Sequence, residues 1–340
     1  MKTKFPINLV HYRFQKVLRL RQLLVRGQSV LVAVSGGQDS LCLLRLLLDL
    51  QPAWEWQLAV AHCDHCWLGD QGIAEHVQKL ADSWGVSFYL RTATVPPRNE
   101  AQARQWRYQM LAEMAQTTGS SAVVTAHTQS DRAETLLHNL IRGSGADGLQ
   151  SLSWQRELVS GIDLVRPMLE ISREETSAFC REQGLSVWND VDNNNLAFSR
   201  NRIRQELLTY LKEHFNPQAE THIARTADLL QADVQELERA ATELLARVTH
   251  PKKPWLNRVV LRREPLSLQR RVIRQFLKAY LSVSNSLAFD HVEKCVSLLR
   301  SPNRSSTDPF PGGQRAVVEH PWIWLTPNIE ECKLVRAQGD

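Results

Sequence analysis

Short apolar runs alternate with helical patterns over the first half of this 340-residue chain, and this alternation constrains the fold more than any other feature. The apolar runs, which read as buried strands, lie at residues 29–34, 57–61, 86–91 and 122–125. The helical patterns that follow them cover residues 39–50, 73–84, 100–117 and 131–142. Because strand–helix units in series are joined by crossovers, we expect an α/β fold with a parallel sheet flanked by helices.

The loops that follow the four predicted strands are the places where we expect a ligand. In open parallel sheets, ligands bind beyond the carboxyl ends of the strands, where the connecting loops meet. These loops cover residues 35–40, 62–72, 92–99 and 127–131.

The loop after the first strand, Ser35-Gly-Gly-Gln-Asp-Ser40, has the features of an anion-binding turn. Its glycines allow a tight turn that presents backbone N–H groups, while the serine hydroxyls and the start of the next helix add donors. The loop lacks a Walker A lysine, but the Asp39 carboxylate can hold Mg²⁺ against phosphates. We predict that a nucleotide phosphate binds the six residues Ser35, Gly36, Gly37, Gln38, Asp39 and Ser40. The alternative is a serine-capped turn without a ligand.

Imidazoles and carboxylates follow the second and fourth strands as well. With the acid of the phosphate loop, they make up the catalytic candidates Asp39, His65, His127, Asp131 and Glu134. Asp131 and Glu134 lie three residues apart at the start of a helix, so we expect them to face one side. Each histidine could instead be a core residue bonded to a carbonyl. Cys63 and Cys66 could bind metal or carry sulfur, but no second C-x-x-C completes a zinc site.

Several arginines are candidates for contact with substrate. On the helix predicted at residues 100–117, Arg104 and Arg107 share a face with Glu100, and ion pairing along the helix is the alternative. Three arginines further along the chain extend the set, and for the last two of them pairing with Glu206 is the alternative. These are Arg142, Arg202 and Arg204.

Beyond residue 150 the alternation ends and helical patterns dominate. Ser172-Arg-Glu-Glu175 reads as a capping box that opens a helix ending at Gly184. A polar stretch at residues 189–195, a helix at 199–214 and a long helical pattern at 218–249 follow. We predict four parts: a basic N-terminal helix (1–27), a catalytic domain (28–215), a helical connector (216–250) and a small basic C-terminal domain (251–340).

The net charge of +5 is unevenly distributed. Residues 1–27 hold seven basic side chains and no acid, and residues 247–278 hold ten basic side chains and one acid. This pattern favours a polyanionic partner held by the two ends, although a solvated basic helix face would look the same. The C-terminal candidates for such contacts are Lys252, Lys253, Arg262 and Arg263.

No apolar run approaches the length of a membrane span, and the first 15 residues do not resemble a secretory signal. The six cysteines lack the spacing of a disulfide framework. We therefore expect a cytoplasmic protein without a membrane partner. The oligomeric state is left open between a monomer and a homodimer.

The phosphate loop resembles the S-G-G-x-D-S signature of the PP-loop ATP pyrophosphatases. The further motifs together resemble the pattern of the tRNA(Ile)-lysidine synthetases, in the same order along the chain. The matching segments are His62-Cys-Asp-His65, Glu100 to Tyr108, Thr125 to Thr135, Arg142 to Leu149, Arg166-Pro-Met-Leu169, Asn189 to Asn193 and Phe198 to Arg204. Three positions depart from that pattern: Thr128 replaces a histidine, Ser130 replaces an aspartate, and Asp64 replaces an asparagine.

The resemblance implies an ATP-dependent ligase that acts on the isoleucine tRNA with a CAU anticodon. In that reaction ATP adenylates the wobble cytidine with release of pyrophosphate, and the ε-amine of free L-lysine then displaces AMP. The product, lysidine, changes the codon and amino-acid specificity of the tRNA from methionine to isoleucine. The implied cofactors are ATP and Mg²⁺. Two alternatives remain: a PP-loop tRNA thiolase, and a homologue that binds nucleotide or RNA without catalysis.

Overall fold

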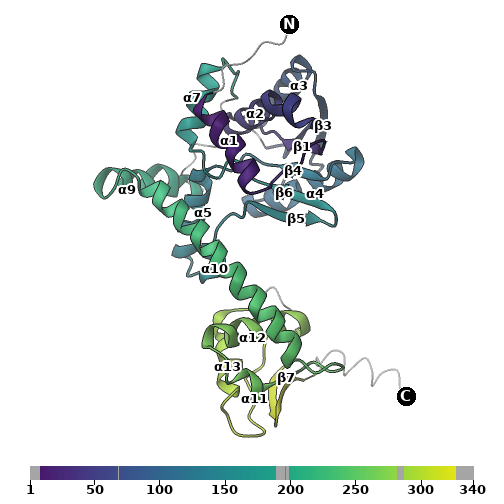
Figure 1. The fold of residues 1–340 in the computed structure, drawn as a ribbon, viewed down its shortest axis with the longest axis vertical. Coiled ribbons are helices and arrows are strands. Elements are labelled where there is room, and N and C mark those ends of the chain that lie inside the picture. The colour runs from purple at the N-terminus through teal and green to yellow at the C-terminus, as the bar shows by residue number, and fades with distance from the viewer. Residues whose placement is uncertain (1–7, 68, 189–195, 197–198, 282–286, 327–340) are drawn as a thin grey trace. The chain divides into compact units, whose positions relative to one another are not determined.

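The computed structural model describes residues 8–67, 69–188, 196, 199–281 and 287–326. Contacts divide the chain between Gln231 and Ala232 into two compact units (Figure 1). The break falls within the long helix α10 (Ala219–Val248), which begins in the first unit and ends in the second. The four parts and the limits that the sequence suggests stay a prediction.

A six-stranded sheet forms the centre of the first unit (Figure 1). Its strands are β1 (Ser29–Ala33), β2 (Gln57–Asp64), β3 (Ser87–Thr92), β4 (Ala122–Val124), β5 (Gln155–Val159) and β6 (Ile162–Val165). They lie in the order β3-β2-β1-β4-β6-β5, and all neighbours are parallel except the pair β5–β6. The predicted α/β fold with a parallel sheet is therefore confirmed. The hairpin β5–β6, which the sequence did not lead us to expect, extends the sheet at one edge.

Helices cover both faces of this sheet. The first seven described helices of this unit are α1 (Leu9–Leu20), α2 (Gln38–Trp54), α3 (Ile73–Ser83), α4 (Glu100–Thr118), α5 (Gln129–Ile141), α6 (Ala146–Leu149) and α7 (Arg173–Glu182). The residues of β1 alternate between the two faces, as the period of a strand requires. Val30 and Val32 join a core with α1, α2, α3 and α7, whereas Leu31 packs with α4 on the other face. The four helices predicted from the alternation are thus confirmed.

One buried ion-pair cluster attaches α1 to α2. Asp49 interrupts the apolar face of α2, and its carboxylate lies 2.7 Å from Arg45 and 2.9 Å from the imidazole of His11 on α1. The Asp49 side chain is only 7% exposed, so the Arg45 guanidinium and the contact with His11 compensate the cost of its burial. Asp49 and its partners therefore anchor the first helix to the sheet layer.

From Ser199 the described chain forms one continuous helical stretch. It consists of α8 (Ser199–Arg202), a π-helical segment η2 (Ile203–Leu208) and α9 (Thr209–His214), followed by α10. The predicted helix at residues 199–214 is confirmed, with the π-helical turn as an addition. The polar stretch at residues 189–195 and part of the motif from Phe198 to Arg204 lie outside the described residues.

The second unit has its own small sheet and its own core. Its strands β7 (Trp255–Asn257), β8 (Ala316–Glu319) and β9 (Trp322–Leu325) pair antiparallel in the order β7-β9-β8. Its helices α11 (Arg258–Leu261), α12 (Leu266–Tyr280) and α13 (Phe289–Leu298) pack with the end of α10 around buried aliphatic residues and Phe276.

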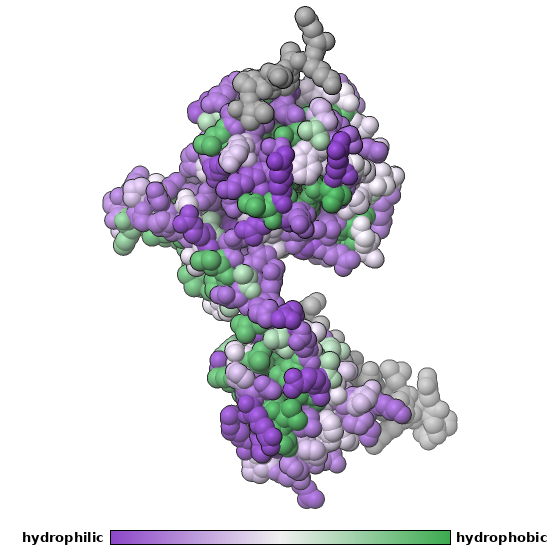
Figure 2. Space-filling model, in the orientation of Figure 1, coloured by the Kyte–Doolittle hydropathy of each residue, from purple (hydrophilic) through white to green (hydrophobic). Residues whose placement is uncertain are grey.

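Hydrophilic residues cover most of the face seen in Figure 2, with smaller apolar patches between them. Among the described helices, none combines the length and the apolar character needed to cross a membrane.

Candidate functional site

The predicted phosphate loop lies between β1 and α2. The Ser40 hydroxyl accepts the backbone N–H of Ser35 at 3.2 Å and donates to the carbonyl of Gly37 at 2.8 Å, which closes the loop on itself. Gly37 stands at the N-cap of α2 without a side-chain cap, so the first N–H groups of this 17-residue helix lack a side-chain acceptor there. The structure thus gives the loop the donor arrangement of an anion site.

Gly36 is required by its conformation and by its neighbours. Its φ angle is +86°, and a Cβ atom there would lie 3.2 Å from Ile73 and 3.4 Å from Trp188. The backbone N–H of Trp188 also donates to the Gly36 carbonyl at 3.0 Å, and the Trp188 ring covers Gly72 in the same way. A side chain on the loop would therefore cost backbone strain and displace this tryptophan.

Asp39, in the first turn of α2, is held by two residues of α7. The Thr176 hydroxyl donates to one carboxylate oxygen, and the Arg173 guanidinium lies 3.6 Å from the other. Burial raises the pKa of Asp39, and the nearby Asp131 adds to the rise, while Arg173 opposes it. Because β1 and β4 are parallel neighbours, the phosphate loop after β1 and the start of α5 after β4 lie at the same edge of the sheet.

Asp39 also meets the chemical requirement for a metal ligand. Mg²⁺ in proteins is usually bound by one or two carboxylates together with substrate phosphates, and the phosphate loop offers such a carboxylate. Among the described residues, no group of three or more His, Cys, Asp and Glu side chains could hold a metal ion by itself. Mg²⁺ at this loop would take its remaining ligands from nucleotide phosphates and water.

The start of α5 is stabilised by a capping box. Thr128, at the N-cap, donates from its backbone N–H to Asp131 at 2.7 Å and from its hydroxyl at 2.8 Å. Thr128 is fully buried, so the residue that departs from the family pattern has a clear structural role. Burial alone would raise the pKa of Asp131, but the His127 imidazole and the Thr128 N–H lower it below its usual range.

Glu134 is paired with Arg204 of η2. The guanidinium makes two hydrogen bonds to the Glu134 carboxylate, one of them at 2.8 Å, and lies 3.8 Å from Asp131. The Glu134 side chain is only 2% exposed, and this burial raises its pKa to about 6. Asp131 and Glu134 therefore share one side of α5, as predicted, and one arginine binds both.

Arg202 and Arg142 have different surroundings. Arg202 pairs with Glu206 at 3.4 Å on the surface, as the alternative predicts. Arg204 pairs with Glu134 and not with Glu206. Arg142 is exposed at the C-cap of α5. The roles of both residues in substrate binding stay predictions.

His127 and His65 lie beside a group of arginines. Burial lowers the pKa of His127 to about 3, and Arg166, Arg104 and Arg107 contribute to this shift. Burial and Arg107 likewise lower the pKa of His65 to about 4. Both imidazoles are therefore neutral at pH 7. His127 bonds to the Thr125 hydroxyl at 2.9 Å instead of a carbonyl.

The arginines of this group have no acidic partner within the described residues. Arg104 lies over the ring of Tyr108 at 5.0 Å, and Arg166 donates to the Ser153 carbonyl at 2.8 Å. Glu100 pairs with Arg200 at 3.6 Å, so it does not neutralise Arg104 on its own helix. A concentration of guanidinium groups without carboxylates is suited to an anionic ligand.

His65 has one unsatisfied nitrogen. Its Nε2 atom is buried and has no hydrogen-bond partner, while the ring stacks on Trp67 at 5.3 Å and meets the edge of Trp106 at 5.2 Å. An unpaired buried polar atom of this kind is costly, so it indicates a place where a ligand atom can bind.

Cys63 and Cys66 point to different carbonyl groups. The Cys63 thiol faces the carbonyl of Arg107, and the Cys66 thiol faces that of Ala93 at 3.4 Å. Burial raises the pKa of Cys63 to about 12 and also raises that of Cys66. Neither thiol is activated as a nucleophile, because activation requires a lowered pKa.

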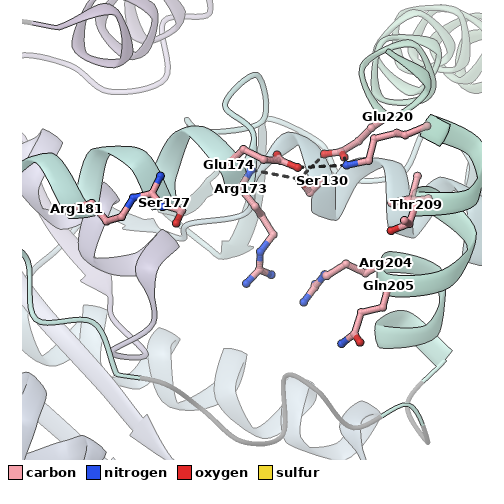
Figure 3. Close-up of a pocket in the computed structure, with 11 residues that line it drawn as sticks. Ser130, Arg173, Glu174, Ser177, Arg181, Arg204, Gln205, Thr209 and Glu220 are labelled. Atoms are coloured by element: carbon pink, nitrogen blue, oxygen red, sulfur yellow. Dashed lines mark hydrogen bonds and ion pairs between the residues drawn. The ribbon is translucent and has the colours of Figure 1, made fainter. Parts of the chain in front are cut away.

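A cavity of about 490 Å³ adjoins the site between α5, α7 and the stretch from η2 to α10 (Figure 3). Charged side chains of both signs line it. The lining residues are Ser130, Arg173, Glu174, Ser177, Arg181, Arg204, Gln205, Leu208, Thr209, Lys212 and Glu220.

The residues that hold Asp39 could not be identified from the sequence. Arg173 and Thr176 lie on the helix that the predicted capping box opens, with Ser172 confirmed at the N-cap, but nothing in the local sequence links that helix to the phosphate loop. Arg166 belongs to one of the matching segments, where the sequence assigns it no role.

The PP-loop domain family matches residues 9–211, more than half of the chain. Proteins named tRNA(Ile)-lysidine synthase from Nostoc sp. (strain PCC 7120) and Synechocystis sp. (strain PCC 6803) are 53% and 50% identical to it. These similarities cover 93% and 89% of this chain and 96% and 93% of the relatives. A chloroplastic tRNA(Ile)-lysidine synthase from Zygnema circumcarinatum is 34% identical over 87% of this chain and 82% of its own length.

Among solved structures, a U34-tRNA thiolase from Methanococcus maripaludis has a TM-score of 0.56 at 16% identity, covering 65% of this chain and 78% of its own. That likeness concerns the fold alone. Identity of about half over nearly the full length of both chains, in contrast, defines a family. The protein therefore belongs to the tRNA(Ile)-lysidine synthase family.

Proposed function

We propose that this protein joins L-lysine to the wobble cytidine of the isoleucine tRNA with a CAU anticodon, using ATP and releasing pyrophosphate and AMP. The observation that carries the proposal is the position of the predicted phosphate loop beside the acidic start of α5: the Arg173 guanidinium lies 3.6 Å from Asp39, and the Arg173 backbone N–H donates to Ser130 of α5. The membership of the tRNA(Ile)-lysidine synthase family supports the same reaction.

In the first step, the 2-carbonyl oxygen of cytidine attacks the α-phosphate of ATP. An O–P bond forms, and the bond to pyrophosphate breaks. The N–H groups at the start of α2 and the Ser35 hydroxyl are suited to hold the departing phosphates. Arg104, Arg107 and Arg166, which act electrostatically on His127, are suited to offset the negative charge of the adenylate. If Mg²⁺ binds at Asp39, it neutralises phosphate charge there.

In the second step, the ε-amine of lysine forms a C–N bond to the cytidine carbon, and the bond to AMP breaks. The amine must lose a proton. With a pKa of about 6, Glu134 is the described carboxylate of this site best matched to accept it near neutral pH. His65 and His127, neutral at pH 7, are suited to hydrogen-bond the base rather than to carry charge.

The decisive experiment supplies ATP, Mg²⁺, lysine and transcribed isoleucine tRNA, and measures pyrophosphate release and the mass of the modified nucleoside. A cytidine heavier by one lysyl group, formed only when lysine is present, is the expected result. A product that instead requires a sulfur donor would support a thiolase, which the raised pKa values of Cys63 and Cys66 disfavour. Binding without pyrophosphate release would support a non-catalytic homologue.

We also propose that the second unit contacts the tRNA backbone. Lys252, Lys253, Arg262 and Arg263 are all exposed, and no carboxylate among the described residues pairs with them. Lys253 lies 4.2 Å from the ring centre of Trp255, which leaves its charge available.

Neutralising these four residues together with glutamine is expected to weaken tRNA binding and to leave ATP binding unchanged. Because a phosphate neutralised by a cationic side chain releases counterions, the slope of log K against log salt should fall by about 0.9 for each phosphate that the variant no longer neutralises. A filter-binding titration at several salt concentrations measures both effects. As a control, Lys79 and Arg239, which pair with glutamates on exposed helix faces, are neutralised instead. An unchanged salt slope in the fourfold variant would contradict the proposal.

A further inference from the structure

Position 130 departs from the family pattern, which carries an aspartate there. Ser130 is only 3% exposed, and its hydroxyl donates a hydrogen bond to the carboxylate of Glu220 (Figure 3). Glu220 comes from the first turn of α10, 90 residues away in sequence. A carboxylate from another helix therefore lies directly beside the position where the family pattern has its own.

Glu220 is buried and held in place. It is 8% exposed, and its second oxygen accepts a hydrogen bond from the Lys212 ammonium at 3.3 Å. Lys212 also contacts Glu174 at 3.2 Å. Burying a charged carboxylate is costly unless it is paired, and these contacts provide the pairing.

The Ser130 hydroxyl has a second contact, which leads to the phosphate loop. It accepts the backbone N–H of Arg173, the first residue of α7, at 3.3 Å. That N–H is one of the four at a helix start that have no partner within the helix. The Arg173 side chain then reaches back to Asp39 at 3.6 Å. The chain of contacts thus runs from Glu220 through Ser130 and Arg173 to Asp39.

We propose that Glu220 is a positioning residue for the phosphate loop, and that with Ser130 it replaces the aspartate of the family pattern. A serine hydroxyl is neutral, so by itself it supplies no negative charge near the start of α7. By donating its proton to Glu220, Ser130 keeps its lone pairs directed to the Arg173 N–H, and the carboxylate supplies the negative charge favoured at a helix start. The pair holds α7, and with it Arg173 and Thr176, against Asp39.

The test moves the carboxylate from position 220 to position 130 and measures ATP affinity. ATP affinity does not depend on which reaction follows. Glu220→Gln removes the charge and is expected to weaken ATP binding about fivefold. Ser130→Asp/Glu220→Gln returns a carboxylate to position 130 and is expected to restore affinity to within about twofold of wild type. Ser130→Asp alone places two carboxylates side by side, so it should bind ATP more weakly than the double variant.

Glu174→Gln is the matched control, because Glu174 contacts Lys212 but not Ser130. It should bind ATP within about twofold of wild type. Thermal unfolding of all variants separates a positioning role from general instability. The double variant still lacks the Lys212–Glu220 ion pair, so it cannot recover ATP affinity if that pair acts only by stabilising the fold. The proposal is overturned if Glu220→Gln binds ATP like wild type, or if the double variant binds no better than Glu220→Gln. A failure of lysidine formation in the wild type would leave these ATP measurements interpretable.

Discussion

Replacing Asp39 with asparagine is expected to slow pyrophosphate release by about a hundredfold to a thousandfold, the usual cost of losing one electrostatic group at a reacting centre. Asparagine keeps the size of the side chain and one oxygen that can accept the hydrogen bond from Thr176. Only the charge is lost, and with it the contribution to any metal ion at the phosphates. The measurement is a steady-state pyrophosphate assay with saturating ATP, lysine and tRNA.

The same variant should remain as stable as the wild type or become more stable. Burial raises the folded pKa of Asp39 above its unfolded value, so the ionised carboxylate costs stability as pH rises through that window. Asparagine removes this cost at neutral pH. Asp82→Asn, an exposed substitution on α3, serves as the control and should change neither property. Activity of Asp39→Asn near the wild-type rate would contradict the role assigned to Asp39.

Replacing Arg204 with methionine is expected to destabilise the protein by about 3–5 kcal/mol, the typical cost of leaving one member of a buried ion pair without its partner. Glu134 is 2% exposed, and the Arg204 guanidinium binds both of its oxygens. Arg202→Met is the matched control two residues away. Its pair with Glu206 is exposed, so the cost should stay within about 1 kcal/mol. Denaturant unfolding of the two variants gives the comparison.

The loss in Arg204→Met should depend on pH in a defined direction. Glu134 already has a folded pKa of about 6, above its usual value, and removal of the arginine raises it further. A raised carboxyl pKa means that the folded state binds the proton more tightly, so stability falls as pH rises through the folded value. The variant should therefore be closest to wild type near pH 5 and furthest from it near pH 8. Adding Glu134→Gln should recover part of the lost stability, and a loss that does not vary with pH would contradict the assignment.

The turn of the predicted phosphate loop follows from local sequence. Gly36 adopts a positive φ of +86° next to other side chains, a demand that only glycine meets without strain, and so it marks the turn. The capping box predicted at Ser172 is also local, since it joins residues three apart, and the one found at Thr128 has the same spacing. The hairpin β5–β6 could not be predicted in this way, because its strands are only five and four residues long and β5 is polar and largely exposed.

The departures from the family pattern look different once their contacts are known. Thr128 is a buried N-cap that binds Asp131, and Ser130 bridges Glu220 and the start of α7. Both substituted side chains therefore have hydrogen-bond partners at the site. The absence of a histidine and an aspartate of the pattern therefore does not favour the alternative of a homologue without catalysis.

The sequence by itself determined the parallel α/β sheet, the glycine turn of the predicted phosphate loop and the sheet edge at which the candidate groups lie, because strand and helix periods and glycine turns depend on near neighbours. Only the tertiary structure decided which side chains meet. Thr176 is 137 residues from Asp39, Arg204 is 70 from Glu134, and Glu220 is 90 from Ser130. These pairs form because α7, η2 and α10 pack beside the starts of α2 and α5, and the direction in which a helix packs after a crossover leaves no signal in its own residues.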